Sequence, residues 1–274
     1  MDTRTLPTLP GIVTKLNSLA EDNKSSVHEM ARLVSSDQVL SARILRLANS
    51  PSYGFYRVST ISNAMILLGV DVVKSLVLSS SIFAIMEQSA VGLWEHSLGA
   101  GVAANIIARR LSLPECEEIA TAALLHDIGK VIVRIKLQDE YHELFDSASE
   151  KGLPLQEIER EILDTDHAEV GGWLAKSWNL PEKLVVPITF HHDVPAASLH
   201  QVKTAVVHFA DVLIKASGFG SGGVDFVPAL QPEAWNRLGM TEAVLAEIVE
   251  ELEEKLIDTK NFSLEIQSTD ETKT

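Results

Sequence analysis

The chain has 274 residues and a single cysteine, Cys116, so no disulfide can form within it. A small scaffold held together by disulfides is therefore excluded. Aromatic residues make up only 5% of the chain, and alternating strand patterns joined by Asn-Gly or Asp-Gly turns are absent. Alanine, leucine and glutamate are abundant, which favours helices over sheets. We therefore expect an all-α protein with one large or two modest domains.

Positive charge is also scarce, because 23 Lys and Arg face 38 Asp and Glu, for a net charge of −15. This balance repels nucleic-acid backbones, so direct nucleic-acid binding is not expected. The most apolar window, residues 64–86, is interrupted by Gly69, Asp71 and Lys74, so we expect no membrane span. Residues 1–10 lack the basic and apolar regions of a signal peptide, which predicts a cytoplasmic protein.

Helical patterns fill two parts of the chain. In the first, residues 6–88, Ser26 and Glu29 have the spacing of a capping box at the start of a helix. A polar stretch rich in small residues then separates a second helical part, residues 92–260. Residues 261–274 follow an acidic helix and are predicted to be a disordered tail.

Histidines and aspartates with metal-ligand character are concentrated in the second part. The candidates are His96, His126, Asp127, His167, His191, His192, His208 and Asp211. Imidazole nitrogens and carboxylate oxygens suit iron, manganese or zinc, and the lack of a cysteine set excludes a structural zinc finger. Spacing alone also allows a simpler interpretation, in which single histidines are buried in the core and the doublet lies on the surface.

The His126-Asp127 pair follows a predicted apolar helix, residues 119–125, and we expect Gly129 to let the chain turn there. Adjacent helical residues point about 100° apart. The pair can therefore share one ion only from a helix end, or the carboxylate can bridge two ions. His208 and Asp211 are three residues apart on a predicted helix and share one face.

The order of these residues resembles a known superfamily. His96, the segment 124–130 with sequence LLHDIGK, and Asp211 together resemble the HD superfamily of metal-dependent phosphohydrolases. His167 and the His191-His192 doublet are similar to the second-metal ligands of dinuclear HD proteins such as the HD-GYP phosphodiesterases. The Gly-Tyr-Pro element of the latter is absent, since the doublet is followed by Asp-Val-Pro.

The N-terminal half resembles a narrower relative. Segments 6–10, 36–40, 47–51 and 64–69 are similar to the HDOD domain, an HD-related output module of bacterial signalling proteins. The resemblance covers residues 6–216. It implies an N-terminal helical bundle packed on an HD-type helical domain. Because it begins within the first ten residues, we expect a stand-alone module.

The resemblance also implies a ligand set. One ion would be held by His96, His126, Asp127 and Asp211, and Asp127 would bridge to a second ion held by His167, His191 and His192. Iron or manganese is favoured, with zinc, magnesium or nickel as alternatives.

Asp127 and Lys130 would then be the catalytic residues. Lys130 would neutralise the charge of a bound phosphate, and the alternative is a lysine that satisfies the dipole at a helix C-terminus. His208 would orient a ligand carboxylate or simply be buried.

Three functions remain open at this point. The first is a signal transduction protein that is also a metal-dependent phosphohydrolase of the phosphodiesterase or phosphatase type. The second is a non-catalytic signalling module in which the metal site is structural or empty. The third is a di-iron oxygenase of the HD superfamily. The expected partner is an unidentified signalling protein or a phosphorylated small molecule such as a nucleotide.

Overall fold

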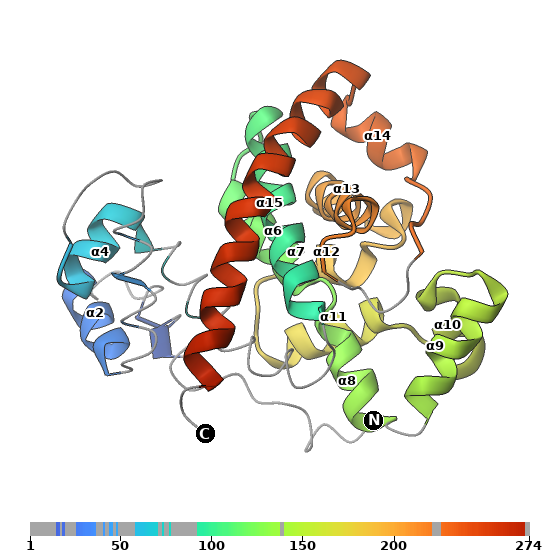
Figure 1. The fold of residues 1–274 in the computed structure, drawn as a ribbon, viewed down its shortest axis with the longest axis horizontal. Helices are drawn as coiled ribbons and strands as arrows, with labels where there is room; N and C mark the ends of the chain where they lie inside the picture. The colour runs from blue at the N-terminus through green and yellow to red at the C-terminus, as the bar shows by residue number, and fades with distance from the viewer. Residues whose placement is uncertain are drawn as a thin grey trace. The chain divides into compact units, whose positions relative to one another are not determined.

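The structure is a computed structural model of the whole chain. It describes residues 15–16, 18–19, 26–36, 41, 44–45, 48, 58–70, 73, 77, 92–137, 140–220 and 226–271. Every element in the described part is a helix (Figure 1), which confirms the all-α prediction. Contacts divide the chain into two compact units, Met1–Ile85 and Met86–Thr274. The expected limits at residues 88 and 92 stay a prediction.

The N-terminal unit contains helices α2 (Val27–Ser35) and α4 (Ile61–Leu68). The predicted capping box is confirmed, because the Ser26 side chain accepts a hydrogen bond from the Glu29 backbone and the Glu29 side chain accepts one from the Ser26 backbone. Thr60 caps α4 in the same manner. The sequence segments 6–10, 37–40 and 49–51 lie outside the described residues.

The C-terminal unit carries the predicted ligands. Its helices are α6 (Leu93–Arg110), α7 (Cys116–Leu125), α8 (Ile128–Lys136), α9 (Glu140–Lys151), α10 (Leu155–Leu163), α11 (His167–Ser177), α12 (Glu182–Phe190), α13 (Gln201–Ser217), α14 (Pro232–Leu238) and α15 (Glu242–Glu271), with a short 3-10 helix, η3 (Val194–Ala196), before α13. Prolines precede or open several of them: Pro154 and Pro181 stand at the N-caps of α10 and α12, and Pro232 opens α14.

Helix α6 is the centre of this unit and packs against α7, α13 and α15 (Figure 1). Its buried face is built from small residues, including Ala100, Ala103, Ala104 and Ala108, none of which has exposed surface. Small side chains let neighbouring helix backbones approach closely. Because α6 is packed on several sides, the ligands on α6, at the α7–α8 junction and on α13 lie close together in the interior of the unit.

Two glycines explain how α8, α11 and α12 pack. A Cβ on Gly129 would lie 1.8 Å from the carbonyl oxygen of His167, and one on Gly172 would lie 2.1 Å from Oγ1 of Thr189. Both positions therefore require glycine for close helix contact. The prediction that Gly129 makes a turn is wrong, because this residue lies inside α8 and the turn is made by His126 and Asp127.

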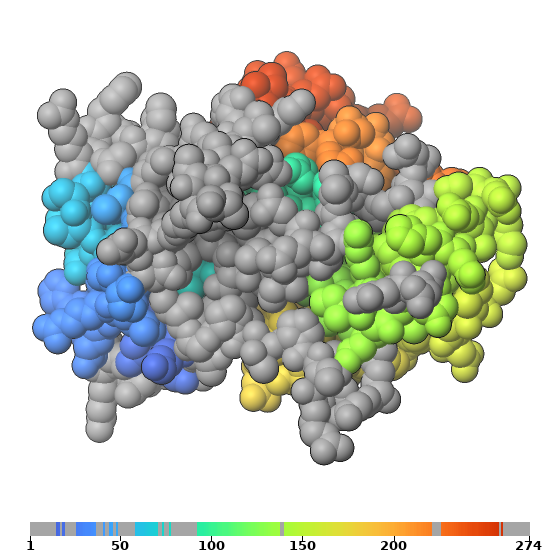
Figure 2. Space-filling view, turned by 60° about the horizontal axis from the view of Figure 1, so that its bottom comes forward, coloured from blue at the N-terminus to red at the C-terminus, as the bar shows by residue number. Residues whose placement is uncertain are grey.

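Helices α9 and α10 pack on each other and form one edge of the unit (Figures 1 and 2). Helix α15 crosses α6 and continues to Glu271, into the segment for which the sequence predicts a disordered tail. Within the described residues, no helix combines the length and the apolar character that a membrane crossing needs.

Candidate metal centre

The His126-Asp127 pair lies at the junction of two helices. Helix α7 ends at Leu125 and α8 begins at Ile128, so the pair forms the link between them. The expectation that these ligands lie at a helix end is confirmed. Because the backbone changes direction here, the two adjacent side chains can point into the same space, which a continuous helix would not allow.

The first group of converging side chains surrounds one carboxylate oxygen of Asp127. Its members are His96, His126, Asp127 and Asp211, which offer ligand atoms within 4.8 Å of one another. Nε2 of His96 lies 3.0 Å from Oδ1 of Asp211, and Nε2 of His126 lies 3.3 Å from Oδ2 of Asp127. All four side chains are buried. The structure thus brings together the four residues predicted to hold one ion.

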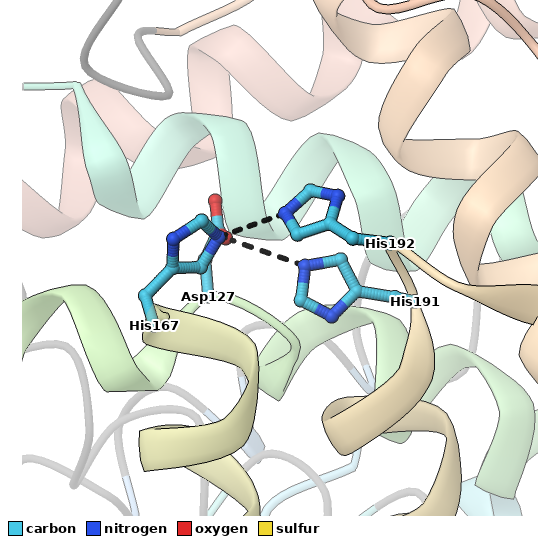
Figure 3. Close-up of side chains that lie close together, drawn as sticks. All are labelled: Asp127, His167, His191 and His192. Carbon is cyan, nitrogen blue, oxygen red and sulfur yellow. Dashed lines mark hydrogen bonds and ion pairs between the residues drawn. The ribbon is translucent and has the colours of Figure 1, made fainter. Parts of the chain in front are cut away.

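The second group surrounds the other oxygen of Asp127 (Figure 3). Its members are Asp127, His167, His191 and His192. Nε2 of His167 lies 3.2 Å from Oδ1 of Asp127 and 2.9 Å from Nε2 of His192. Nε2 of His191 lies 3.8 Å from the same Oδ1. Asp127 therefore presents one oxygen to each group, as a carboxylate that bridges two ions would.

Hydrogen bonds fix the orientation of three of these imidazoles. Nδ1 of His126 donates to the carbonyl of Ala123, and Nδ1 of His191 donates to the carbonyl of Ile188. Nδ1 of His167 donates to the carboxylate of Glu159. These partners occupy Nδ1 and direct Nε2 of each ring at the centre, which is the usual orientation of a metal-binding histidine.

The electrostatics of the centre favour a cation. Burial alone would raise the pKa of Asp127, but the neighbouring His126 and Lys130 hold it well below its usual value. Burial would lower the pKa of His126, and the carboxylates of Asp127 and Asp211 outweigh it and raise that pKa to about 9. Both carboxylates are thus ionised at neutral pH. Their buried negative charges favour a cation at the centre.

Two buried atoms test whether a metal fits. Oδ1 of Asp127 and Nε2 of His191 have no hydrogen-bond partner among the described residues. Burial lowers the pKa of His191 well below its usual value, so its Nε2 is a free lone pair at neutral pH. Buried polar atoms are normally paired, and a cation between these groups would satisfy both. The donor set of imidazoles and carboxylates matches manganese, iron or zinc.

Comparison with known proteins agrees with this architecture. Residues 6–194 match the HDOD domain family. The chain belongs to the HDOD family. A structure from Geobacter sulfurreducens, described as an HDOD domain protein with unknown function, is 30% identical with a TM-score of 0.78 over 95% of this chain and 93% of that one. A protein from Shewanella amazonensis SB2B, provisionally named a phosphohydrolase, is 25% identical with a TM-score of 0.65 over 90% of this chain and 95% of that one.

A curated relative is an uncharacterized protein from Treponema pallidum, which is 26% identical over 77% of this chain. The HDOD chain spans only 42% of the length of that relative. The family match ends at residue 194, so Asp211 on α13 lies beyond it. The contacts of Asp211 with the other ligands in this HDOD chain, and not the family match, place it in the centre.

Lys130 is part of the centre of this HDOD protein. Its ammonium donates to Oδ2 of Asp127 at 2.7 Å, and its side chain is buried. It belongs to the first turn of α8, where the helix dipole disfavours a cation. The alternative that Lys130 satisfies a helix C-terminus is therefore wrong, and its position is explained by the charge of Asp127.

His208 lies beside the centre and contacts the backbone rather than a carboxylate. Its Nδ1 donates to the carbonyl of His191 at 2.8 Å, and its Nε2 accepts from the backbone N–H of Gln231 at 3.1 Å. The Gln231 side chain also bonds the carbonyl of His192 and the N–H of Val194. His208 and Gln231 thus hold the turn that carries the histidine doublet.

Two charged residues of the HDOD centre were missed by the sequence analysis. Lys215 donates to Oδ2 of Asp211 at 2.8 Å, and its spacing of four residues on one helix was the available signal. Glu159 is a buried carboxylate that contacts His167. The only indication in the sequence was that this charged residue shares a helix face with the apolar Leu155 and Ile158, both of which are buried.

Proposed function

We propose that this HDOD protein binds two divalent ions and hydrolyses a phosphate ester of a small molecule such as a nucleotide. The observation that carries the proposal is the division of seven side chains, six of them buried, into two four-residue groups that share Asp127. A shared carboxylate sets two ions at the separation of about 3.5–4 Å that is typical of dinuclear phosphatases.

The chemistry of the ions, when bound, is to polarise a phosphoryl oxygen and to lower the pKa of a water molecule. The protein's own contribution is to hold the ligands rigidly and to exclude bulk water. Six of the seven ligands are fully buried, and three imidazoles are fixed through Nδ1. Such preorganisation is a large part of catalysis in phosphoryl transfer.

A small pocket beside the second group supports an anionic substrate. Its lining includes the charged or ionisable side chains of Lys130, Lys215 and His167, together with Pro154, Leu155, Gln156, Phe226 and Pro228. The two lysines offset the charges of Asp127 and Asp211, so two divalent ions would leave the centre strongly positive. The pocket encloses about 20 Å³, which holds one or two water molecules, and a phosphoryl group would enter by displacing them.

The relative from Shewanella amazonensis also supports hydrolysis, since its provisional name is phosphohydrolase and most of each chain is covered. An expected role in signal transduction has no comparable support from a structure at this level of identity. We therefore propose it only as the context in which a hydrolase of this kind would act, with an unidentified signalling protein as a further partner.

The test begins with metal analysis of the purified protein. We expect close to two equivalents of manganese, iron or zinc, and fewer than about 0.2 equivalents would contradict the proposal. Hydrolysis is then assayed without oxygen on p-nitrophenyl phosphate, bis-p-nitrophenyl phosphate and a set of nucleotides. Asp127→Ala should lower the rate by about 10² or more, while Asp146→Ala, on the exposed face of α9, should not change it.

The same experiment separates the other two functions. A protein that binds metal and turns over none of these substrates would be a non-catalytic module. A protein whose activity requires dioxygen would be a di-iron oxygenase. Either result contradicts the proposed hydrolase.

A further inference from the structure

Glu159 is a buried carboxylate that no part of the proposed hydrolysis uses. It lies on α10 with no exposed surface. One of its oxygens, Oε2, accepts two hydrogen bonds from the same residue, His167: from the backbone N–H at 2.9 Å and from Nδ1 at 2.5 Å. Glu159 therefore fixes both the backbone and the imidazole of a residue in the second ligand group.

His167 differs in this respect from the other two fixed imidazoles. His126 and His191 each donate from Nδ1 to a carbonyl three residues earlier, so their orientation depends only on their own helical turn. His167 is the first residue of α11 and has no such preceding turn. The orientation of its Nε2 depends on a side chain from another helix.

The second oxygen of Glu159 argues against a purely structural role. Oε1 is buried and has no hydrogen-bond partner among the described residues. A buried carboxylate oxygen without a partner reduces stability, because its desolvation is not compensated. The carboxylate is thus explained by its contact with His167 rather than by packing.

We propose that Glu159 is a positioning residue for the second ion. Its carboxylate holds the proton of His167 on Nδ1, directs Nε2 toward Asp127 and His192, and increases the donor strength of Nε2. The proposal deepens the proposed function, since it rests on the second ion and not on hydrolysis. It implies that the two ions are held unequally, with the second dependent on α10.

The arrangement of the helices gives this inequality a physical cause. The first ion's ligands come from α6, the α7–α8 link and α13, which pack around the centre of the unit. Helix α10 packs mainly on α9 at the edge of the unit (Figure 1). Any movement of α10 would reach His167 through Glu159 and leave the first group in place.

The experiment measures Mn²⁺ binding to chelator-treated protein, with free Mn²⁺ counted by electron paramagnetic resonance and no substrate present. His96→Ala and His192→Ala assign the two binding steps, because each residue belongs to one group only. We expect Glu159→Ala to weaken the second step by about 10–100-fold and to leave the first unchanged. Glu159→Gln, which keeps one acceptor oxygen, should weaken it less.

Two control variants lie on the same helix. Ile158→Ala removes a fully buried neighbour and tests whether disturbed packing alone affects the second ion. Glu157→Gln removes an exposed charge one residue further away. Both should bind two Mn²⁺ as the wild-type protein does.

Three results with the variants would overturn the proposal. They are unchanged second-step binding in both Glu159 variants, equal weakening of both steps, and the same selective loss in Ile158→Ala. A wild-type protein that takes up a single Mn²⁺ would overturn it together with the dinuclear centre. Because the binding steps are measured without substrate, a lack of hydrolysis would contradict only the proposed function.

Discussion

The ammonium of Lys215 lies 2.8 Å from Oδ2 of Asp211, one helical turn earlier on α13. Asp211 has no exposed surface and the Lys215 side chain is 13% exposed, so this is a largely buried ion pair. Burial would raise the pKa of Asp211, and Lys215 with the histidines holds it well below its usual value. In the absence of metal, Lys215 thus supplies charge that an ion would otherwise supply.

We expect Lys215→Met to destabilise the metal-free protein by about 3–5 kcal/mol, because it leaves Asp211 buried without its cation. The loss should be smaller with Mn²⁺ bound, since the ion then neutralises the carboxylate. Urea denaturation with chelator and with Mn²⁺ measures both values. Lys176→Met, at an exposed position of α11, is the matched control. An equal loss under both conditions would contradict this account.

The ligands could be predicted from the sequence because their residue types and their order along the chain can be recognised without a structure. Their division into two groups was implied only by the resemblance to dinuclear HD proteins, and spacing alone could not give it, since His96 and Asp211 are 115 residues apart in sequence. The contact of Glu159 with His167 crosses from one helix to the next. No local pattern shows which buried stripe faces a ligand.

The role of Gly129 could not be predicted for a related reason. In the sequence it follows a ligand pair and has the appearance of a turn residue. Gly129 must lack a side chain because the backbone of α11 packs directly against it, and this contact exists only in the folded unit. Close helix contacts of this kind are tertiary, and helix-end signals in the sequence do not report them.

Gly129→Ala should displace α11 from α8. The added Cβ would meet the backbone of His167 and Gly171, at 1.8 and 2.7 Å, and backbone cannot move aside as a flexible side chain can. We expect a loss of about 3 kcal/mol or more, together with weaker binding of the second Mn²⁺. Gly101→Ala, whose Cβ would lie 3.3 Å from the Ala120 carbonyl, should cost far less. Similar unfolding midpoints for the two variants would contradict the close contact.

Gln231→Ala should loosen the turn that carries the histidine doublet. The side chain of Gln231 donates to the His192 carbonyl at 2.6 Å and accepts from the Val194 N–H at 2.9 Å. Loss of both bonds should destabilise the protein by about 1–3 kcal/mol, measured by urea denaturation. Asn236→Ala, at an exposed position of α14, is the control. Equal effects of the two variants would show that the bonds to the turn contribute nothing.

Glu115 joins the start of α7 to α12 and α13, because its carboxylate accepts from Lys203 at 2.5 Å and from Lys183 at 3.1 Å. These hydrogen bonds lower the pKa of Glu115 below its ordinary value of 4.5. The carboxylate of Glu115 therefore binds a proton less readily in the folded state than in the unfolded state. Its contribution to stability is complete above pH 4.5 and is lost as the pH falls through the lower, folded-state pKa.

We accordingly expect Glu115→Gln to unfold at a lower urea concentration than wild type at pH 7, and the difference to shrink as the pH falls below about 4.5. Lys203 is largely buried, so the variant also leaves its ammonium with a weaker partner. Glu143→Gln, at an exposed position of α9, should show no difference at either pH. A difference for Glu115→Gln that stays constant or grows toward low pH would mean that its ionised carboxylate does not hold these three helices together.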